Sequence, residues 1–320
     1  MATPDSSDVP HRTTRTRLVL GFLVIYVVWG STYLAIRWGV ETIPPFIMGA
    51  VRFLLAGGMM YAYSRWRGAK APTMREWRAS AIVGALLLFI GNGAVSWSEQ
   101  RVSSGMTSLL VATVPLWLVL CEVAQGKRPG LIKWLGVAFG LVGVGLLVLP
   151  ADGHISSAAV EPVGAIVLAL GSLSWTIGSL YSRTAPLAKP AALAISMQML
   201  VGGAMLLVLS IVSGELAHVN RDAVSMASVY SLLYLIVFGS LIGFSTYMWL
   251  LTVASPTAVG TYAYVNPLVA VLLGVAFAGE RIPPQAFLAM LVIVGGVAMV
   301  SLGGQFQGQF RARFPSRKTG

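Results

Sequence analysis

Apolar runs long enough to cross a lipid bilayer recur along most of the 320-residue chain. A helix that rises roughly 1.5 Å per residue needs about 20 residues to cross the hydrocarbon core. Hydrophobic residues make up 56% of the chain and charged residues only 10%, which leaves too little polar surface for a soluble globule of this length. The sequence therefore predicts an all-α polytopic membrane protein.

Ten of these runs are predicted to be transmembrane helices, and proline or glycine stands at or beside the start of six of them. They cover residues 18–38, 44–63, 79–98, 103–122, 131–149, 162–182, 189–212, 228–250, 256–279 and 284–303. Residues 1–17 form a polar tail before the first run, and residues 304–320 form a basic tail after the last.

The distribution of Lys and Arg predicts how these helices are oriented. If both tails are cytoplasmic, 17 of the 22 basic residues fall on the cytoplasmic side, four fall on the opposite side, and Arg52 lies within a helix. Cytoplasmic loops are enriched in Lys and Arg in membrane proteins generally. The net charge of +11 is thus explained by orientation and by contact with anionic lipids, without a nucleic-acid partner.

Few residues are available for catalysis or metal binding. The three histidines lie outside the apolar runs, and the single cysteine, Cys121, excludes an intramolecular disulfide and a cysteine-based metal cage. No phosphate-binding loop is present, so ATP is not the direct energy source. We expect no enzyme activity, no metal and no cofactor.

Residue pairs at two fixed spacings indicate an internal repeat. Trp29 and Trp175 are 146 residues apart, as are Pro44 and Pro190, and a spacing of 152 recurs further on. Pairs at these spacings also include Arg37 with Arg183, Arg52 with Gln198, Gly91 with Gly243, Trp97 with Trp249, Pro115 with Pro267, and Gly143 with Gly295. The repeats are predicted to cover residues 18–150 and 162–303. Because each holds five helices, an odd number, the two repeats must be inverted in the membrane.

Short motifs in both halves resemble those of a known transporter family. They are Trp29-Gly30-Ser31-Thr32-Tyr33, Val51-Arg52-Phe53-Leu54, Gly91-Asn92-Gly93, Val111-Ala112-Thr113-Val114-Pro115-Leu116, Tyr262-Ala263-Tyr264-Val265-Asn266-Pro267 and Gly279-Glu280-Arg281. Together they resemble the ten-helix EamA-type branch of the drug/metabolite transporter superfamily, and look closest to its YedA-like permeases. The resemblance implies export or exchange of small metabolites through a central cavity. One departure is Gly126-Lys127-Arg128, which stands where many family repeats have Gly-Glu-Arg.

Arg52 is predicted to lie roughly 12 Å into the membrane. A charge at that depth needs a partner, backbone carbonyls or a wet cavity. Two interpretations remain open: a structural clamp between helices, favoured by the polar Gln198 at the equivalent position, or a cavity residue.

A polar stripe on the third helix is the best candidate for a polar patch. Asn92, Ser96 and Glu99 share one helical face, whereas the equivalent positions in the second half are apolar. Glu99 is the leading candidate for proton coupling or cation binding. The alternative is a solvated interfacial acid beside Arg101.

Other candidate substrate-binding residues combine aromatic rings with polar groups. Trp29 lies near mid-span, where packing between helices competes with a role in a pocket. Tyr262 and Asn266 share a helical face and are expected to oppose Asn92 and Ser96 across the cavity, while Pro115 and Pro267 are expected to break their helices. The full predicted set is Trp29, Tyr33, Asn92, Ser96, Thr113, Trp117, Trp175, Tyr262 and Asn266.

These observations predict a bacterial inner-membrane secondary transporter, monomeric or homodimeric, that exports or exchanges amino acids or related amphipathic compounds. A multidrug exporter of lipophilic cations is the main alternative. A sugar-phosphate carrier would favour several basic residues within the helices, and only Arg52 is there. The alternatives outside transport are an integral membrane enzyme, whose acids or histidines would cluster at one interface, and an oligomeric channel.

Overall fold

Helices make up nearly all of the regular structure in the computed structural model, which describes residues 15–148, 161–218, 221–280 and 284–313. No strand occurs in these ranges. The first half contains α1 (Arg15–Gly39), α2 (Pro45–Trp66), α3 (Met74–Gly84), η1 (Ala85–Asn92), α4 (Gly93–Ser98), α5 (Ser104–Val111), α6 (Val114–Ala124) and α7 (Leu131–Val148). The second half contains α8 (Pro162–Ser182), α9 (Ala191–Val212), η2 (Glu215–His218), η3 (Arg221–Ala223), α10 (Met226–Tyr234), η4 (Leu235–Phe244), α11 (Ser245–Val253), α12 (Pro256–Val259), α13 (Tyr262–Ala278) and α14 (Pro284–Arg313).

Seven described helical segments are long and apolar enough to cross a membrane. They are Arg15–Gly39, Pro45–Trp66, Met74–Ser98, Ser104–Ala124, Pro162–Ser182, Ala191–Val212 and Met226–Val253. Three shorter apolar helices occupy Leu131–Leu146, Val265–Ala278 and Pro284–Val300. The all-helical class is confirmed, and helix is found in each of the ten predicted ranges. That all ten cross a membrane stays a prediction.

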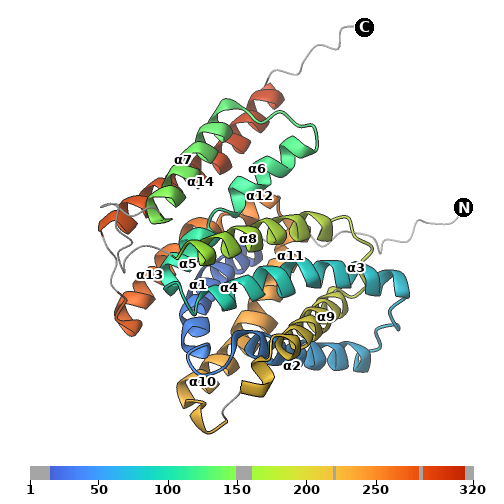
Figure 1. Ribbon diagram of the computed structural model, residues 1–320. Coiled ribbons are helices and arrows are strands. Elements are labelled where there is room, and N and C mark those ends of the chain that lie inside the picture. Colours follow the sequence, from blue (N-terminus) through green and yellow to red (C-terminus); the bar gives the residue numbers. More distant parts are fainter. Residues whose placement is uncertain (1–14, 149–160, 219–220, 281–283, 314–320) are drawn as a thin grey trace, which may run out of the picture.

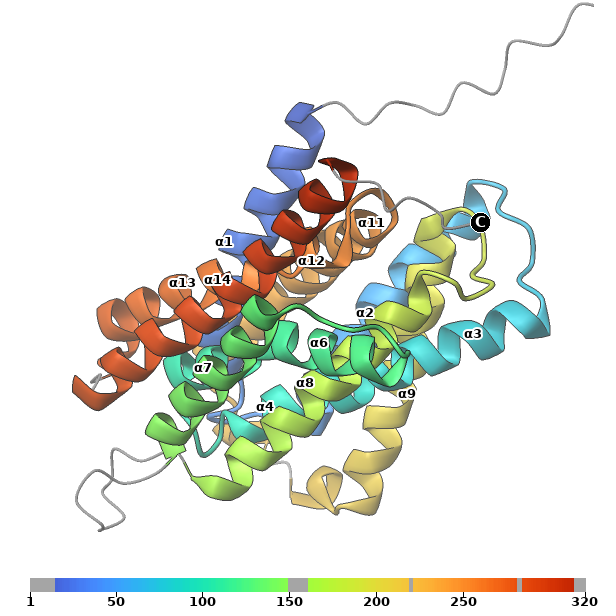
Figure 2. The ribbon, with the colours of Figure 1, turned by 90° about the horizontal axis from the view of Figure 1, so that it is seen from above.

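Two long helix pairs join the halves of the chain. α2 packs along α9, and α7 packs along α14, as both ribbon views show (Figures 1 and 2). Glycine makes the second contact possible: a methyl group added at Gly136 would lie 2.6 Å from the carbonyl oxygen of Gly296. Such close approach through small residues is typical of packed helices in membranes.

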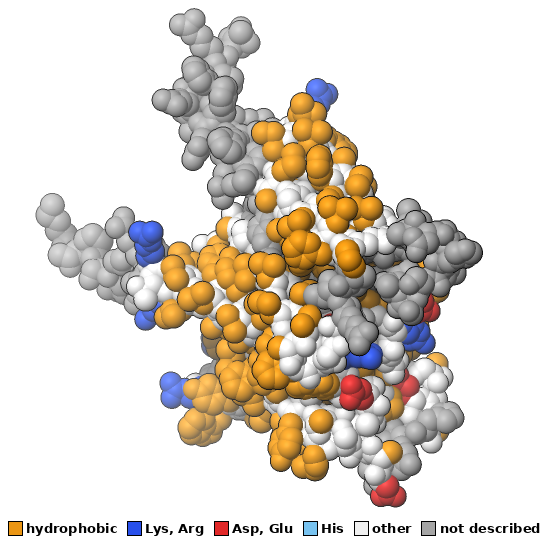
Figure 3. Space-filling model, turned by 90° about the vertical axis from the view of Figure 1, so that its left-hand side faces the viewer, with side chains coloured by type: hydrophobic (Ala, Val, Ile, Leu, Met, Phe, Trp, Pro, Cys, Tyr) orange, Lys and Arg blue, Asp and Glu red, His pale blue; other side chains and the backbone are white. Residues whose placement is uncertain are grey.

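The exterior is apolar over broad areas. Large hydrophobic side chains such as Leu141, Leu170, Val208 and Leu272 are more than half exposed. Hydrophobic side chains cover much of the face in Figure 3, and charged side chains are few there. A surface of this kind suits contact with lipid.

Several helix ends differ from the predicted ones for local reasons. α3 begins at Met74 instead of residue 79, because the Thr73 hydroxyl accepts a hydrogen bond from the Glu76 amide while the Glu76 carboxylate accepts one from the Thr73 amide. α14 continues to Arg313 instead of ending at 303, since no proline interrupts the chain before Pro315.

The two predicted helix breaks are not equivalent. The first falls at Ala112–Thr113, just before Pro115, which is the second residue of α6. The second falls at Gly260–Thr261, and α13 runs through Pro267 without interruption. The expectation that Pro267 breaks its helix is therefore wrong.

Two wide-turned π-helical segments interrupt the third and eighth predicted helices. η1 ends at Asn92 and η4 ends at Phe244, which are 152 residues apart. π-Helical turns are rare and are frequent at functional sites. The two segments therefore occupy equivalent positions in the two halves of the chain.

Candidate functional site

A cavity lies between the two halves of the chain and is lined by residues from both. Its walls come from α1, α2, η1, α4 and α5 in the first half and from α8, η4 and α13 in the second. Its volume is about 70 Å³. Of the candidate residues from the sequence, those lining the cavity are Trp29, Tyr33, Arg52, Asn92, Trp175 and Tyr262.

Arg52 supplies the charge of this cavity. Its side chain is buried, and the residue is only 4% exposed. Nε donates a hydrogen bond to Ser240 Oγ at 2.8 Å, and Nη1 donates one to Asn92 Oδ1 at 3.3 Å. Both partners lie in the π-helical segments, so Arg52 links η1 to η4. Arg52 thus connects two helical segments, as a structural clamp would, and also lines the cavity, as a ligand-binding residue would.

Aromatic rings from four helices, α1, α8, α11 and α13, pack together beside this cavity, and those of Trp29, Trp175 and Tyr262 line it. The ring of Trp29 lies 5.5 Å from Trp175, 4.8 Å from Tyr247 and 5.4 Å from Tyr262, measured between centroids. Trp175 Nε1 donates to Tyr247 Oη at 2.9 Å, and that hydroxyl is 2.7 Å from Ser179 Oγ. Edge-to-face contacts and a shared hydrogen bond fix these rings relative to one another. We call Trp29, Trp175, Tyr247 and Tyr262 the aromatic cluster.

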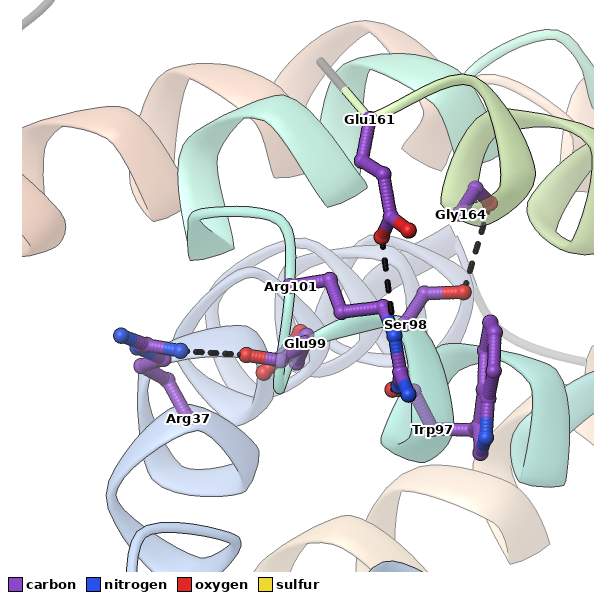
Figure 4. A network of polar contacts seen from close by, with 7 residues as sticks. All are labelled: Arg37, Trp97, Ser98, Glu99, Arg101, Glu161 and Gly164. Carbon is purple, nitrogen blue, oxygen red and sulfur yellow. Dashed lines mark hydrogen bonds and ion pairs between the residues drawn. The ribbon is translucent and has the colours of Figure 1, made fainter. Parts of the chain in front are cut away.

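Glu99 directly follows the last residue of α4 (Figure 4). The residue is fully buried, and neither carboxylate oxygen has a hydrogen-bond partner. Arg37 Nη1 instead donates to the backbone carbonyl of Glu99 at 2.5 Å. Burial, followed by the charge of Glu280, raises the pKa of Glu99 well above its ordinary value, and Arg37 opposes this shift. The solvated alternative for Glu99 does not fit this burial.

The charged side chains near Glu99 bind other groups and not its carboxylate. Arg101 forms an ion pair with Glu161 at 3.6 Å, and its guanidinium lies 3.9 Å from the centre of the Trp97 ring (Figure 4). Ser98 Oγ donates to the carbonyl of Gly164 at 3.3 Å (Figure 4). Arg101 is thus occupied by Glu161, and Glu99 is left without a basic side chain in hydrogen-bond contact with its carboxylate.

The remaining candidates lie outside the cavity lining. Ser96 is buried one turn beyond Asn92. Thr113 Oγ1 donates to the Leu110 carbonyl at 2.7 Å, and it borders with Trp117 a separate apolar cavity near α7. Asn266 is buried, and with its amide oriented so that the nitrogen can donate, that nitrogen lies 3.1 and 3.3 Å from the carbonyl oxygens of Tyr26 and Tyr262. Asn266 therefore satisfies backbone groups and does not oppose Asn92 across the cavity.

Sequence reasoning missed several cavity residues that carry no distinctive pattern. Thr32, Ser172 and Gly239 line the cavity, and Ser240 holds Arg52 from η4. Thr32 is three residues after Trp29 and Ser172 is three residues before Trp175, so helical spacing from those candidates could have found them. Nothing in the sequence marks Gly239, where an added methyl group would lie 2.7 Å from Arg52 Nη2.

Contacts in one half recur at the expected spacings in the other. Arg37 donates to the Glu99 carbonyl at 2.5 Å, and its counterpart Arg183 donates to the Leu251 carbonyl at 2.6 Å. Residue 251 is 152 positions after residue 99, the spacing of the sequence repeat. The same spacing joins Gly91, which lies against Trp175, to Gly243, which lies against Trp29.

Comparison with known proteins identifies the family. Residues 16–149 and residues 162–302 each match the EamA-like transporter family. The chain belongs to that family. It is 40% identical to the uncharacterized inner membrane transporter YedA of Escherichia coli strain K12, over 87% of this chain and 89% of YedA. It is 24% identical to the uncharacterized transporter YoaV of Bacillus subtilis strain 168, over 88% of this chain and 96% of YoaV.

This match confirms the family that the sequence motifs resemble, and the chain is therefore a membrane transporter of the EamA-like family. A solved crystal structure with 19% identity covers 90% of this chain and 98% of its own, with a TM-score of 0.63. That likeness supports the fold alone. The two EamA matches leave residues 150–161 between them, and the two five-helix repeats stay a prediction.

Proposed function

We propose that this EamA-like protein is a secondary transporter that exports or exchanges small metabolites, such as amino acids or related amphipathic compounds. The observation that carries the proposal is the cavity between the two halves, which combines one buried charge, neutral polar groups and aromatic rings. Alternating access places a substrate site where two repeats meet. The inner-membrane location follows the relative YedA.

The topology in this proposal has ten crossings, two inverted repeats and cytoplasmic termini. The paired contacts of Arg37 and Arg183 support the repeat, because each arginine closes the end of the equivalent helix in its own half. An odd number of crossings per repeat then requires inversion. The excess of basic residues on one side supports the orientation and contact with anionic lipids, for a monomer or a homodimer alike.

The small cavity volume supports an alternating mechanism. Ligand pockets commonly measure roughly 300–1,000 Å³, whereas this cavity measures about 70 Å³. A metabolite can then enter only if helices move apart. In the proposed orientation the aromatic cluster lies on the cytoplasmic side of the cavity, so its separation opens the inner path.

Glu99 is the proposed coupling residue. A buried carboxyl group without a hydrogen-bond donor is held in its neutral form, and a change that admits water would release its proton. Opening and closing of the outer end of α4 would therefore change the protonation of Glu99. Proton movement and helix movement are linked through this one group.

A multidrug exporter of lipophilic cations is the alternative within transport, favoured by the aromatic cluster, which could stack on a cation. The buried positive charge of Arg52 opposes it. An integral membrane enzyme is the alternative outside transport. No group of three or more metal-ligating side chains occurs among the described residues, which gives a metal-dependent enzyme no support.

Accumulation of labelled compounds in cells tests the proposal. Cells with the protein should accumulate a transported amino acid less than cells without it if export dominates. Replacing Trp175 by Leu should reduce this difference several-fold, because Trp175 lines the cavity. Replacing Trp66, which is 79% exposed, by Leu is the matched control and should change little. Equal transport by the wild type and the Trp175→Leu variant, with equal amounts in the membrane, would place the substrate elsewhere.

A further inference from the structure

The guanidinium of Arg52 is a buried cation whose partners are all neutral. Ser240 Oγ and Asn92 Oδ1 accept its hydrogen bonds, and the Phe53 ring lies 4.8 Å from Cζ. Carboxylates pair with other basic residues, as Glu161 does with Arg101 and Glu122 with Lys133, and no carboxylate among the described residues pairs with Arg52. A buried charge without a counter-ion is unfavourable, so an anion that reaches it gains a strong and specific attraction.

The position of this charge makes it available to a ligand. Arg52 lines the cavity together with Asn92, Thr32 and Ser172. A guanidinium has five N–H donors in one plane, and the two protein hydrogen bonds leave donors for a further partner. Gly239 allows the guanidinium to lie against its backbone, since a methyl group there would come within 2.7 Å of Nη2.

The repeat provides an internal comparison for Arg52. Its counterpart Gln198 is also fully buried but is neutral, and it does not line the cavity. The fold therefore accommodates an uncharged amide at this place in a repeat. Of the two equivalent positions, the charge stands only at the one that lines the cavity, and a requirement of packing alone does not explain this difference.

The rest of the cavity restricts the anion. Among the residues that the structure describes, one basic residue lines it, which suits a singly charged group better than a phosphate. The other walls are mainly apolar or aromatic, including Trp29, Phe53, Leu88 and Trp175. We propose that Arg52 binds the carboxylate of the transported compound and that the aromatic side of the cavity takes its apolar body. This inference rests on the proposed transport function and specifies the class of its substrate.

Ligands that share one apolar body and differ in charge test this assignment. The probes are 4-methylpentanoate, which carries only a carboxylate, L-leucine, which carries a carboxylate and an ammonium, and 3-methylbutylamine, which carries only an ammonium. The purified full chain in detergent is heated with each probe, and the ligand-induced rise in melting temperature is measured. We expect the two carboxylates to stabilise the wild type in a dose-dependent way, and the amine to give no rise.

Variants separate binding from folding. Arg52→Gln takes its residue from the equivalent position of the second half, and we expect it to weaken binding of both carboxylates at least tenfold. Arg52→Lys keeps the charge but loses the planar fork, so it should bind with intermediate affinity. Arg101→Gln removes a basic side chain outside the cavity and should bind as the wild type does. A variant that is misfolded would also have a lower melting temperature in the absence of ligand, and this value is measured in the same experiment.

Defined outcomes overturn the assignment. It is wrong if Arg52→Gln binds the carboxylates as tightly as the wild type does, if the amine stabilises the wild type and the carboxylates do not, or if neither carboxylate stabilises the wild type. The transport proposal fails separately. Arg52-dependent carboxylate binding without exchange across a proteoliposome membrane would refute transport and keep the anion site. Exchange of amines that does not depend on Arg52 would support transport and refute the anion site.

Discussion

Single side chains decide how polar groups are accommodated in this apolar protein. Arg52 was recognisable from the sequence, because a lone basic residue inside an apolar run must find a partner. Its partners were not, because Asn92 and Ser240 lie 40 and 188 residues away along the chain. Glu99 was recognisable as an acid near a helix end, but only the packing around it reveals that its carboxylate has no donor.

Replacing Glu99 by Gln tests whether this acid is held neutral. The pKa of Glu99 in the folded protein is raised above the ordinary value of about 4.3. Between the ordinary and the raised value the folded protein keeps a proton that the unfolded chain releases, so stability falls as the pH rises through that window. The slope is at most about 1.4 kcal/mol per pH unit for one group.

We therefore expect Glu99→Gln to flatten the decrease of melting temperature with rising pH and to remove any pH dependence of transport between those values. Glu41→Gln is the matched control, because Glu41 is exposed in the turn that follows α1. An unchanged pH profile of both stability and transport in Glu99→Gln would show that Glu99 does not titrate with either.

The hydroxyl of Tyr247 is expected to hold the aromatic cluster together. It accepts from Trp175 Nε1 and contacts Ser179 Oγ, and Tyr247 is only 3% exposed. Tyr247→Phe removes the hydroxyl to which the indole N–H donates at 2.9 Å, and the loss of an acceptor costs about 1–3 kcal/mol for a buried donor. Tyr230→Phe, at a residue 64% exposed, should cost less than about 0.5 kcal/mol. Equal melting temperatures for the two variants would contradict this role.

At the scale of elements, hydrophobic pattern and proline placement predicted where helices form, but not their irregularities. The capping box at Thr73 and Glu76 has a sequence signature, but it precedes the apolar run, so hydrophobicity alone does not include it in the helix. The π-helical segments η1 and η4 carry no sequence signal of that kind. The second break falls at Gly260–Thr261 and not at Pro267, because a neighbouring chain can accommodate a proline inside a membrane helix.

Adjacent glycines in α14 provide a sharp test of its packing on α7. A methyl group at Gly296 would lie 2.6 Å from the Gly136 carbonyl oxygen and 2.7 Å from the Gly140 amide nitrogen, both backbone atoms. Gly296→Ala should therefore destabilise the protein by about 1–3 kcal/mol, the usual cost of overpacking. Gly295→Ala meets no atom within 4 Å and should be neutral or slightly stabilising. Thermal unfolding in detergent compares them, and a neutral Gly296→Ala would contradict the close contact.

At the scale of the whole molecule, the all-helical class and the transporter family were predictable from the sequence, while the two inverted repeats stay a prediction. It could not predict the cavity, since that depends on how α1, α2 and η1 meet α8, η4 and α13. Six of the candidate residues reached the cavity because they lie on inward faces of long helices. Thr113, Trp117, Ser96 and Asn266 lie elsewhere, because identical helical spacing does not fix the rotation of a helix in the bundle.

Orientation in the membrane is testable with single cysteines in a Cys121→Ser background. Lys70→Cys follows α2 and should react with an impermeant thiol reagent only in inside-out vesicles. Ser213→Cys, which is exposed after α9, should react only in right-side-out vesicles or whole cells. Labelling of both residues from one side would refute the ten-crossing topology.

Counterflow in proteoliposomes measures most directly whether one cavity is exposed alternately to the two sides. Vesicles that contain the purified protein are loaded with unlabelled substrate and diluted into a trace of labelled substrate. A carrier with a single alternating site transiently accumulates the label above its equilibrium level, and Trp175→Leu should reduce this peak while Trp66→Leu should not. Label that only equilibrates, at a rate independent of internal substrate, would indicate a channel, and the absence of protein-dependent uptake would exclude transport of that compound.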